Sequence, residues 1–96
     1  MNIRILSLAE RDLLAGFKFY ERQAEGVGSC FLDTLYSDIE SLRLFAGSHQ
    51  TFSGYYRLLS RRFPYGIYYK LQGTEIQVWR VLDCRRNPNW IQKQLK

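Results

Sequence analysis

The sequence predicts an α+β domain in which an antiparallel sheet carries a helical hairpin on one face. Two stretches of the first half space their apolar residues by three and four, as amphipathic helices do. A short alternating segment precedes them, and three strand-like stretches follow in the second half. The predicted order is strand, helix, helix, strand, strand, strand. The 96 residues are enough for one domain, residues 1–96, and too few for two.

The first half begins with residues 2–6, NIRIL, whose alternation predicts a short half-buried strand. A helix is predicted from about residue 8 to about residue 24, and Ser7 with Glu10 has the spacing of a capping box at its start. Its apolar stripe contains Ala9, Leu13, Phe17, Tyr20 and Ala24. After a short turn with two glycines, a second stripe runs to Gly47 and contains Phe31, Leu35, Ile39, Leu42 and Phe45. Two helices joined in this way most easily form an antiparallel hairpin.

The second half is predicted to begin with a loop, residues 48–54, and to continue as strands 55–60, 63–71 and 74–83. Gln72–Gly73 is the predicted tight turn between the last two strands. In the last strand, Arg80 has the same parity as the apolar residues Ile76, Val78 and Leu82. Two explanations stay open, a bulge in the strand or a cation aimed at a specific partner. Both helices are expected on one face of the sheet, which leaves the other face partly open for the cationic second half to line.

The composition excludes several classes of protein. It is that of a soluble globular domain, with 46% hydrophobic and 24% charged residues. No apolar run reaches the ~20 residues needed to cross a bilayer. The N-terminal segment has no signal-like apolar region, so we expect a cytoplasmic protein without a membrane partner. Cys30 and Cys84 form neither a disulfide framework nor a metal motif, so we expect reduced thiols and no metal or cofactor.

The charge is distributed unevenly along the chain. Residues 1–48 contain five Lys or Arg against seven Asp or Glu, a net charge of −2. Residues 49–96 contain nine against two, a net charge of +7, and the two halves together give the total of +5. This asymmetry predicts an anionic partner for the second half, either a nucleic acid or an acidic protein segment.

Two segments of the second half resemble a known family. They are RRFPYGIYY, residues 61–69, and VWRVLDCRRNPNW, residues 78–90. With the order of elements, they make essentially the whole chain similar to the ParE branch of the RelE/ParE family, the toxins of plasmid-stabilisation, type II toxin–antitoxin systems. The most specific part of the resemblance is a Phe-Pro-Tyr-x-Ile-Tyr-Tyr strand followed by a Val-Leu-x-x-Arg-Arg-x-Pro strand end.

The resemblance implies a small basic toxin that is held harmless by an acidic antitoxin, whose C-terminal segment wraps it. ParE-like members act on DNA gyrase, whereas RelE-like members cut mRNA in the ribosomal A site. Many ParE-like chains have His-Gly before the arginine pair, where this chain has Asp83 and Cys84. A third reading is therefore a fold relative that is not toxic and only binds an acidic protein or nucleic acid.

The two activities of the family require different chemistry. RNA cleavage needs groups that transfer protons, and the tail CRRNPNWIQKQLK contains no histidine, tyrosine or carboxylate. His49 and Asp83 are the candidate general bases, although a solvated loop histidine and an aspartate paired with arginine are the simpler readings. We therefore favour a gyrase inhibitor over an enzyme.

Arginine binds carboxylate and phosphate bidentately and stays charged at any relevant pH. The predicted binding residues for a target or an antitoxin are six arginines, Arg57, Arg61, Arg62, Arg80, Arg85 and Arg86. Two aromatic residues, Tyr68 and Trp90, are candidates for stacking against a base. We expect the arginines to converge on the uncovered face of the sheet.

Overall fold

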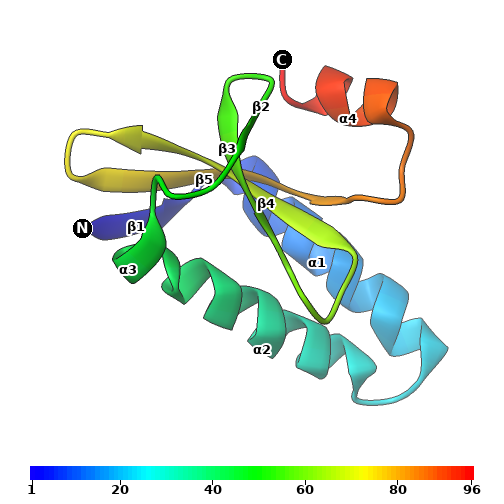
Figure 1. Cartoon of the computed structure of the whole chain (residues 1–96). Coiled ribbons are helices and arrows are strands. Elements are labelled where there is room, and N and C mark those ends of the chain that lie inside the picture. Colours follow the sequence, from blue (N-terminus) through cyan, green and yellow to red (C-terminus); the bar gives the residue numbers. More distant parts are fainter.

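The computed structural model describes residues 1–96 as a five-stranded sheet with helices on both sides (Figure 1). The elements in chain order are β1 Asn2–Ile5, α1 Ser7–Gln23, α2 Val27–Glu40, α3 Leu42–Phe45, β2 Thr51–Phe52, β3 Tyr55–Leu59, β4 Tyr65–Gln72, β5 Glu75–Asp83 and α4 Pro88–Gln94. The predicted α+β class, with a helical hairpin on one face of the sheet, is confirmed. None of the helices is both long enough and apolar enough to cross a membrane.

The strands lie in the order β1-β5-β4-β3-β2. All neighbours are antiparallel except β1 and β5, which pair in parallel from Asn2 opposite Glu75 to Ile5 opposite Val78. The sheet is therefore mixed, and the prediction of a wholly antiparallel sheet is corrected at this strand. A parallel pair needs a long crossover connection, and the helical hairpin with β2, β3 and β4 provides it here.

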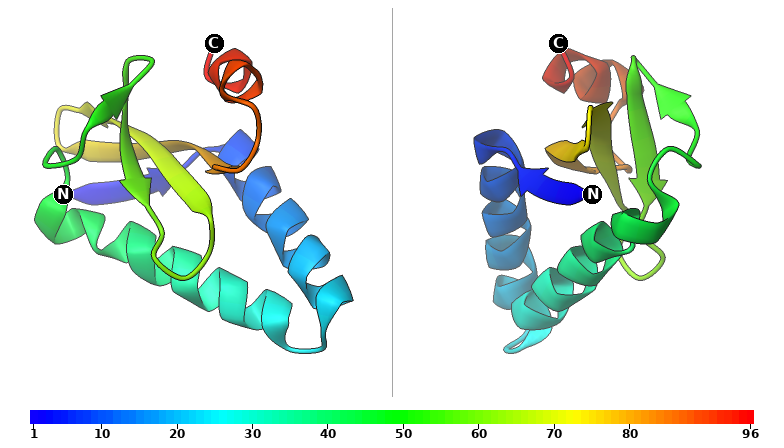
Figure 2. Two further views of the ribbon diagram at one scale, coloured as in Figure 1. Left: turned by 45° about the vertical axis from the view of Figure 1, so that its right-hand side comes forward. Right: turned by 90° about the vertical axis from the view of Figure 1, so that its left-hand side faces the viewer.

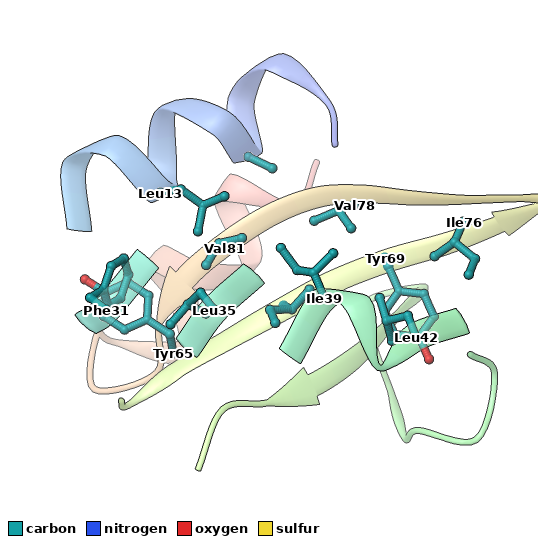
Figure 3. Close-up of a cluster of buried hydrophobic side chains, with 12 residues drawn as sticks. Leu13, Phe31, Leu35, Ile39, Leu42, Tyr65, Tyr69, Ile76, Val78 and Val81 are labelled. Atoms are coloured by element: carbon teal, nitrogen blue, oxygen red, sulfur yellow. The ribbon is translucent and has the colours of Figure 1, made fainter. Parts of the chain in front are cut away.

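The main core lies between the helical hairpin and one face of the sheet. Figure 3 shows side chains from α1 and α2 directed toward those of β4 and β5. The buried residues of this cluster are Ala9, Leu13, Phe31, Leu35, Ile39, Leu42, Tyr65, Ile67, Tyr69, Ile76, Val78 and Val81. The apolar stripes of the sequence predicted most of this core, because each stripe faces the sheet at the period of its own element. Ala24 and Phe45 are exceptions, since Ala24 is exposed just past the end of α1 and Phe45 is exposed at the end of α3.

The helical hairpin is closed by a side chain of α1. Glu21 accepts hydrogen bonds from the backbone N–H groups of Gly26 and Gly28, at 3.0 and 2.9 Å, so it caps the start of α2. A Cβ atom on Gly28 would lie 2.7 Å from the carbonyl oxygen of Phe17, so only glycine allows this close approach of the helices. The predicted capping box at the start of α1 is not formed, because Ser7 is already inside the helix and Leu6 precedes it.

The parity of β5 is broken by a bulge. Tyr68 lies opposite Arg80 and Tyr69 opposite Val78, which leaves Trp79 without a partner on β4. Beyond the bulge the side chains change faces, so Val81 belongs to the main core and Leu82 lies on the other side of the sheet. The prediction that Leu82 shares a face with Ile76 and Val78 is therefore wrong, and the bulge is the reason.

The second face of the sheet is less open than the sequence predicted. Asn87 accepts a hydrogen bond from the backbone N–H of Asn89 at 2.8 Å, and Pro88 begins the short helix α4. Figure 2 shows the helical hairpin and α4 on different sides of the strands. A second cluster forms beneath α4 and contains Tyr55, Tyr68, Leu82, Ile91 and Leu95.

Two smaller differences from the sequence prediction concern the second half of the chain. The short strand β2 lies inside the predicted loop, and the hairpin turn is at residues 73–74, one position later than predicted.

Candidate functional site

A cavity of about 500 Å³ lies between α1, the end of β5 and the start of α4. Figure 1 shows the end of β5 running past α1 before the chain turns into α4. The lining residues are Asp12, Ala15, Phe19, Tyr65, Arg80, Val81, Leu82, Asp83, Arg85, Arg86 and Trp90. The cavity therefore brings together three of the six predicted arginines, the candidate base Asp83 and the candidate stacking residue Trp90.

One side of the cavity is built on a bidentate ion pair between Asp12 and Arg80. The Nε and Nη2 atoms of Arg80 donate to the carboxylate of Asp12 at 2.7 and 2.9 Å, and both side chains are only 14% exposed. The backbone N–H of Val81 donates to the same carboxylate at 2.9 Å. Asp12 can reach this edge of β5 because β1 ends at Ile5 and pairs no further than Val78. The hydrogen bonds of Asp12 raise the pKa of Arg80, so this cation stays charged and already has a partner.

Arg80 also ties the C-terminal helix to the sheet. Its Nη1 atom donates to the backbone carbonyl of Gln94 at 3.2 Å, at the end of α4. A cation at the C-terminus of a helix is favourable because the last carbonyl groups have no partner within the helix. Both explanations of the position of Arg80 in β5 are therefore correct, since Arg80 follows a bulge and also binds specific partners. Sequence reasoning missed Asp12, although the isolated cation on β5 was a signal that such a partner exists.

The rim of the cavity carries a second ion pair, in which Arg85 is exposed and Asp83 is partly buried. Arg85 donates from Nε and Nη2 to the carboxylate of Asp83 at 3.1 and 2.8 Å, and its backbone N–H donates to the same group at 2.9 Å. These hydrogen bonds lower the pKa of Asp83, while burial opposes them more weakly. Asp83 is thus an ionised carboxylate with a poor affinity for protons, which makes it a weak candidate for a general base.

Arg86 is the cation of the cavity that has no carboxylate partner. It takes part in none of the four ion pairs of the protein. Its guanidinium carbon lies 3.9 Å from the centre of the Trp90 ring, in a cation–π contact. One face of the indole is therefore already covered, and a base could stack there only if Arg86 moved away.

The other predicted arginines lie elsewhere, so the six do not converge on one surface. Arg61 and Arg62 line a polar hollow of about 340 Å³ beside α2, together with Asp33, Thr34, Ser37 and Asp38. Arg57 lies on β3 opposite Tyr68, with its guanidinium carbon 5.1 Å from the centre of the Phe52 ring. The sequence shows how many cations the second half contains but not where they lie in the fold, because the bulge and the turns decide where each side chain points.

The remaining candidates are held away from the cavity or beneath the surface. His49 is hydrogen-bonded through Nδ1 to the hydroxyl of Tyr69, and burial lowers the pKa of its ring. This histidine does not line the arginine cavity. Tyr68 is fully buried in the second cluster, and its hydroxyl oxygen has no hydrogen-bond partner. A stacking role for Tyr68 would thus require the cover formed by α4 to open.

The cavity can bind an anionic partner, but it contains few groups that could transfer a proton. Asp83 is ionised, and burial raises the pKa of Tyr65 to about 12. Three arginines and two aspartates give the lining a net charge of +1, alongside the apolar side chains of Phe19 and Ala15. Binding of a negatively charged group beside an apolar one is the chemistry that this arrangement favours.

No protein-family model and no curated protein matches this sequence. Among solved structures, a chain described as "Chromosomal ParDE TA system from P. aeruginosa" is similar in fold, with a TM-score of 0.76. The two chains are 20% identical in sequence, and the similarity covers 84% of this chain and 92% of the other. The fold of this protein is therefore that of a chain from a ParDE system, which is the fold that its two strand motifs predicted.

Proposed function

We propose that this protein is the toxin of a type II toxin–antitoxin system and acts as a ParE-like inhibitor of DNA gyrase. The observation that carries this proposal is the similarity in fold to a chain of a ParDE system, which extends over most of both chains. The two motifs that resemble ParE-like toxins include most of β4, the end of β5 and the start of α4, and residues of both line the arginine cavity. In this proposal the protein works in the cytoplasm, where its target is found.

The proposed mode of action is binding rather than catalysis. Cleavage of RNA would need a proton acceptor beside the cations that stabilise the transition state. Asp83 is committed to Arg85, and His49 is held by Tyr69 outside the cavity. Arg86 contacts the Trp90 ring and has no anionic partner within the protein. This free cation supports a role for Arg86 in binding a negatively charged surface of the target.

The proposed antitoxin would neutralise the toxin by covering this cavity. The second half of the chain, with its net charge of +7, favours a partner that is acidic. A partner that covers Arg85 and Arg86 would deny the same cations to the target. Binding of the target and of the antitoxin would therefore be mutually exclusive.

A supercoiling assay with purified DNA gyrase tests the proposal. Excess protein should block the supercoiling of relaxed plasmid, and translating ribosomes should show no new cuts when the message is mapped by toeprinting. Normal supercoiling together with cuts in the ribosomal A site would instead identify a RelE-like nuclease. Normal supercoiling, uncut messages and unimpaired growth on induction would identify a relative that has lost its toxicity.

A further inference from the structure

We propose that the arginine cavity recognises a polypeptide segment that inserts an apolar side chain between α1 and β5 and whose carboxylate replaces Asp83 on Arg85. This inference deepens the proposed partnership with an antitoxin by naming the chemistry of the partner at this site. In the free protein Asp83 then forms the ion pair with Arg85, and the carboxylate of the partner displaces it on binding.

The rim of the cavity supports the exchange of carboxylates. Asp83 engages Arg85 in the two-point geometry that an external carboxylate would use, with distances of 3.1 and 2.8 Å. The side chain of Arg85 is 59% exposed, so a partner can reach it from solvent. The side chain of Asp83 is 21% exposed, so water reaches the pair from the Arg85 side and its net contribution to stability is modest. A carboxylate of the partner could take over the hydrogen bonds from Arg85, and Arg86, which forms no ion pair, would offer it a second cation.

The wall of the cavity explains why the partner needs an apolar group. Phe19 is 44% exposed and, with the exposed Ala15, gives the α1 side of the cavity an apolar lining. Leu82 and Trp90 also line the cavity and come from β5 and α4. Apolar surface of this kind gains about 25 cal/mol for each Å² that a partner removes from water. A leucine or aromatic side chain would fill this space and a phosphate would not.

The charges of the cavity favour an acidic polypeptide over a nucleic acid. Proteins bind nucleic acids through several cations that neutralise successive phosphates. In this cavity Arg80 is paired with Asp12, and only Arg86 lacks an anionic partner. Asp83 and Asp12 would repel additional phosphates. The surfaces expected to stack against bases are also occupied, because Tyr68 is buried and Arg86 covers one face of Trp90.

The test measures binding to the full chain by fluorescence. The protein contains two tryptophans, so Trp79→Phe leaves Trp90 as the only indole, and it lines the cavity. The indole N–H of Trp79 has no hydrogen-bond partner, so this background loses no hydrogen bond. The probes are a short peptide of leucine and glutamate, a polyglutamate peptide of the same length and a single-stranded oligonucleotide. The leucine–glutamate peptide should bind most tightly.

Three variants separate the parts of the proposal. Asp83→Asn should tighten binding of the leucine–glutamate peptide about two- to fivefold, because it frees Arg85 at the strength of an exposed ion pair. Glu75→Gln is the matched control, since it removes one negative charge from the opposite end of the same strand, where Glu75 faces Arg4. Ala15→Phe fills the cavity from an exposed helix position and should weaken the peptide about tenfold.

The outcomes are distinct. Equal gains for Asp83→Asn and Glu75→Gln would mean that only net charge matters, and they would overturn the exchange of carboxylates. Unchanged peptide binding in Ala15→Phe would overturn the apolar insertion. Tighter binding of the oligonucleotide than of the peptide would replace the proposal with a phosphate site. No gyrase is present in this test, so its failure and the failure of the proposed gyrase inhibition can be told apart.

Discussion

Replacing Asp12 should cost more stability than replacing any other single carboxylate of the protein. Asp12 accepts two hydrogen bonds from Arg80 and one from the backbone N–H of Val81. In the variant Asp12→Asn the size is retained, but a largely buried guanidinium loses its charged partner. Removal of one partner from a fully buried pair costs about 3–5 kcal/mol. The 14% exposure of both side chains reduces the expected loss to about 2–3 kcal/mol.

Urea unfolding, followed by tryptophan fluorescence and circular dichroism, measures this loss. A slope typical of a small domain converts about 2–3 kcal/mol into a decrease of the urea midpoint on the order of 2 M. Asp33→Asn is the matched control, because Asp33 is an exposed helical carboxylate without a hydrogen bond or ion pair and its replacement should change stability by less than about 0.5 kcal/mol. Equal midpoints for the two variants would refute the reasoning that Asp12 holds α1, β5 and Arg80 together.

Three other predictions concern single side chains. Tyr69→Phe should destabilise by about 1–2 kcal/mol, because its hydroxyl makes two hydrogen bonds. Tyr68→Phe should cost less, because its buried hydroxyl makes no hydrogen bond of good geometry, although Arg57 lies near enough to oppose the rise that burial causes in its pKa; urea midpoints compare the two. The pKa of Tyr65 is about 12 in the folded protein and about 10 in an unfolded chain, so the protonated hydroxyl stabilises the fold. This contribution to the free energy of unfolding is fully present below pH 10, and about 2–3 kcal/mol of it is lost as the pH rises from 10 to 12. Tyr65→Phe should flatten that part of the stability curve, and an unchanged slope would contradict the assignment. The pKa of Asp83, measured by carboxyl NMR, should lie below its ordinary value and return toward it in Arg85→Ala; a pKa that does not respond would show that the ion pair does not persist in solution.

The elements that could be predicted from sequence are those whose side chains repeat with a clear period. The stripe of Leu13 and its neighbours on α1, and the alternation of Tyr65, Ile67 and Tyr69 on β4, each predicted the buried face of the element. Local period says nothing about which strand a segment pairs with, so the parallel pairing of β1 with β5 could not be derived from it. That pairing depends on contacts between residues more than seventy positions apart, such as Asn2 and Glu75.

The candidate site was predicted less completely than the fold. Arg85, Arg86 and Trp90 were expected to bind together and do line one cavity, because all three follow the last strand within a few residues. The one-residue bulge at Trp79 could not be placed from parity alone, and it decides where Arg80 points. The helix α4 was missed although Asn87 and Pro88 are a helix start signal, because the segment is short and its three apolar residues, Trp90, Ile91 and Leu95, are too few to show a helical period.

The most direct test of the account compares two double variants in the gyrase supercoiling assay. Arg85→Ala/Arg86→Ala and Arg61→Ala/Arg62→Ala each remove two positive charges, the first pair from the cavity and the second from the hollow beside α2. We expect the wild-type protein and the second variant to block supercoiling and the cavity variant to lose inhibition by at least about tenfold, since each arginine contact to an anionic surface contributes about 1.5–3 kcal/mol. Equal inhibition by the two variants would contradict the claim that the cavity at the end of β5 is where this protein grips its target.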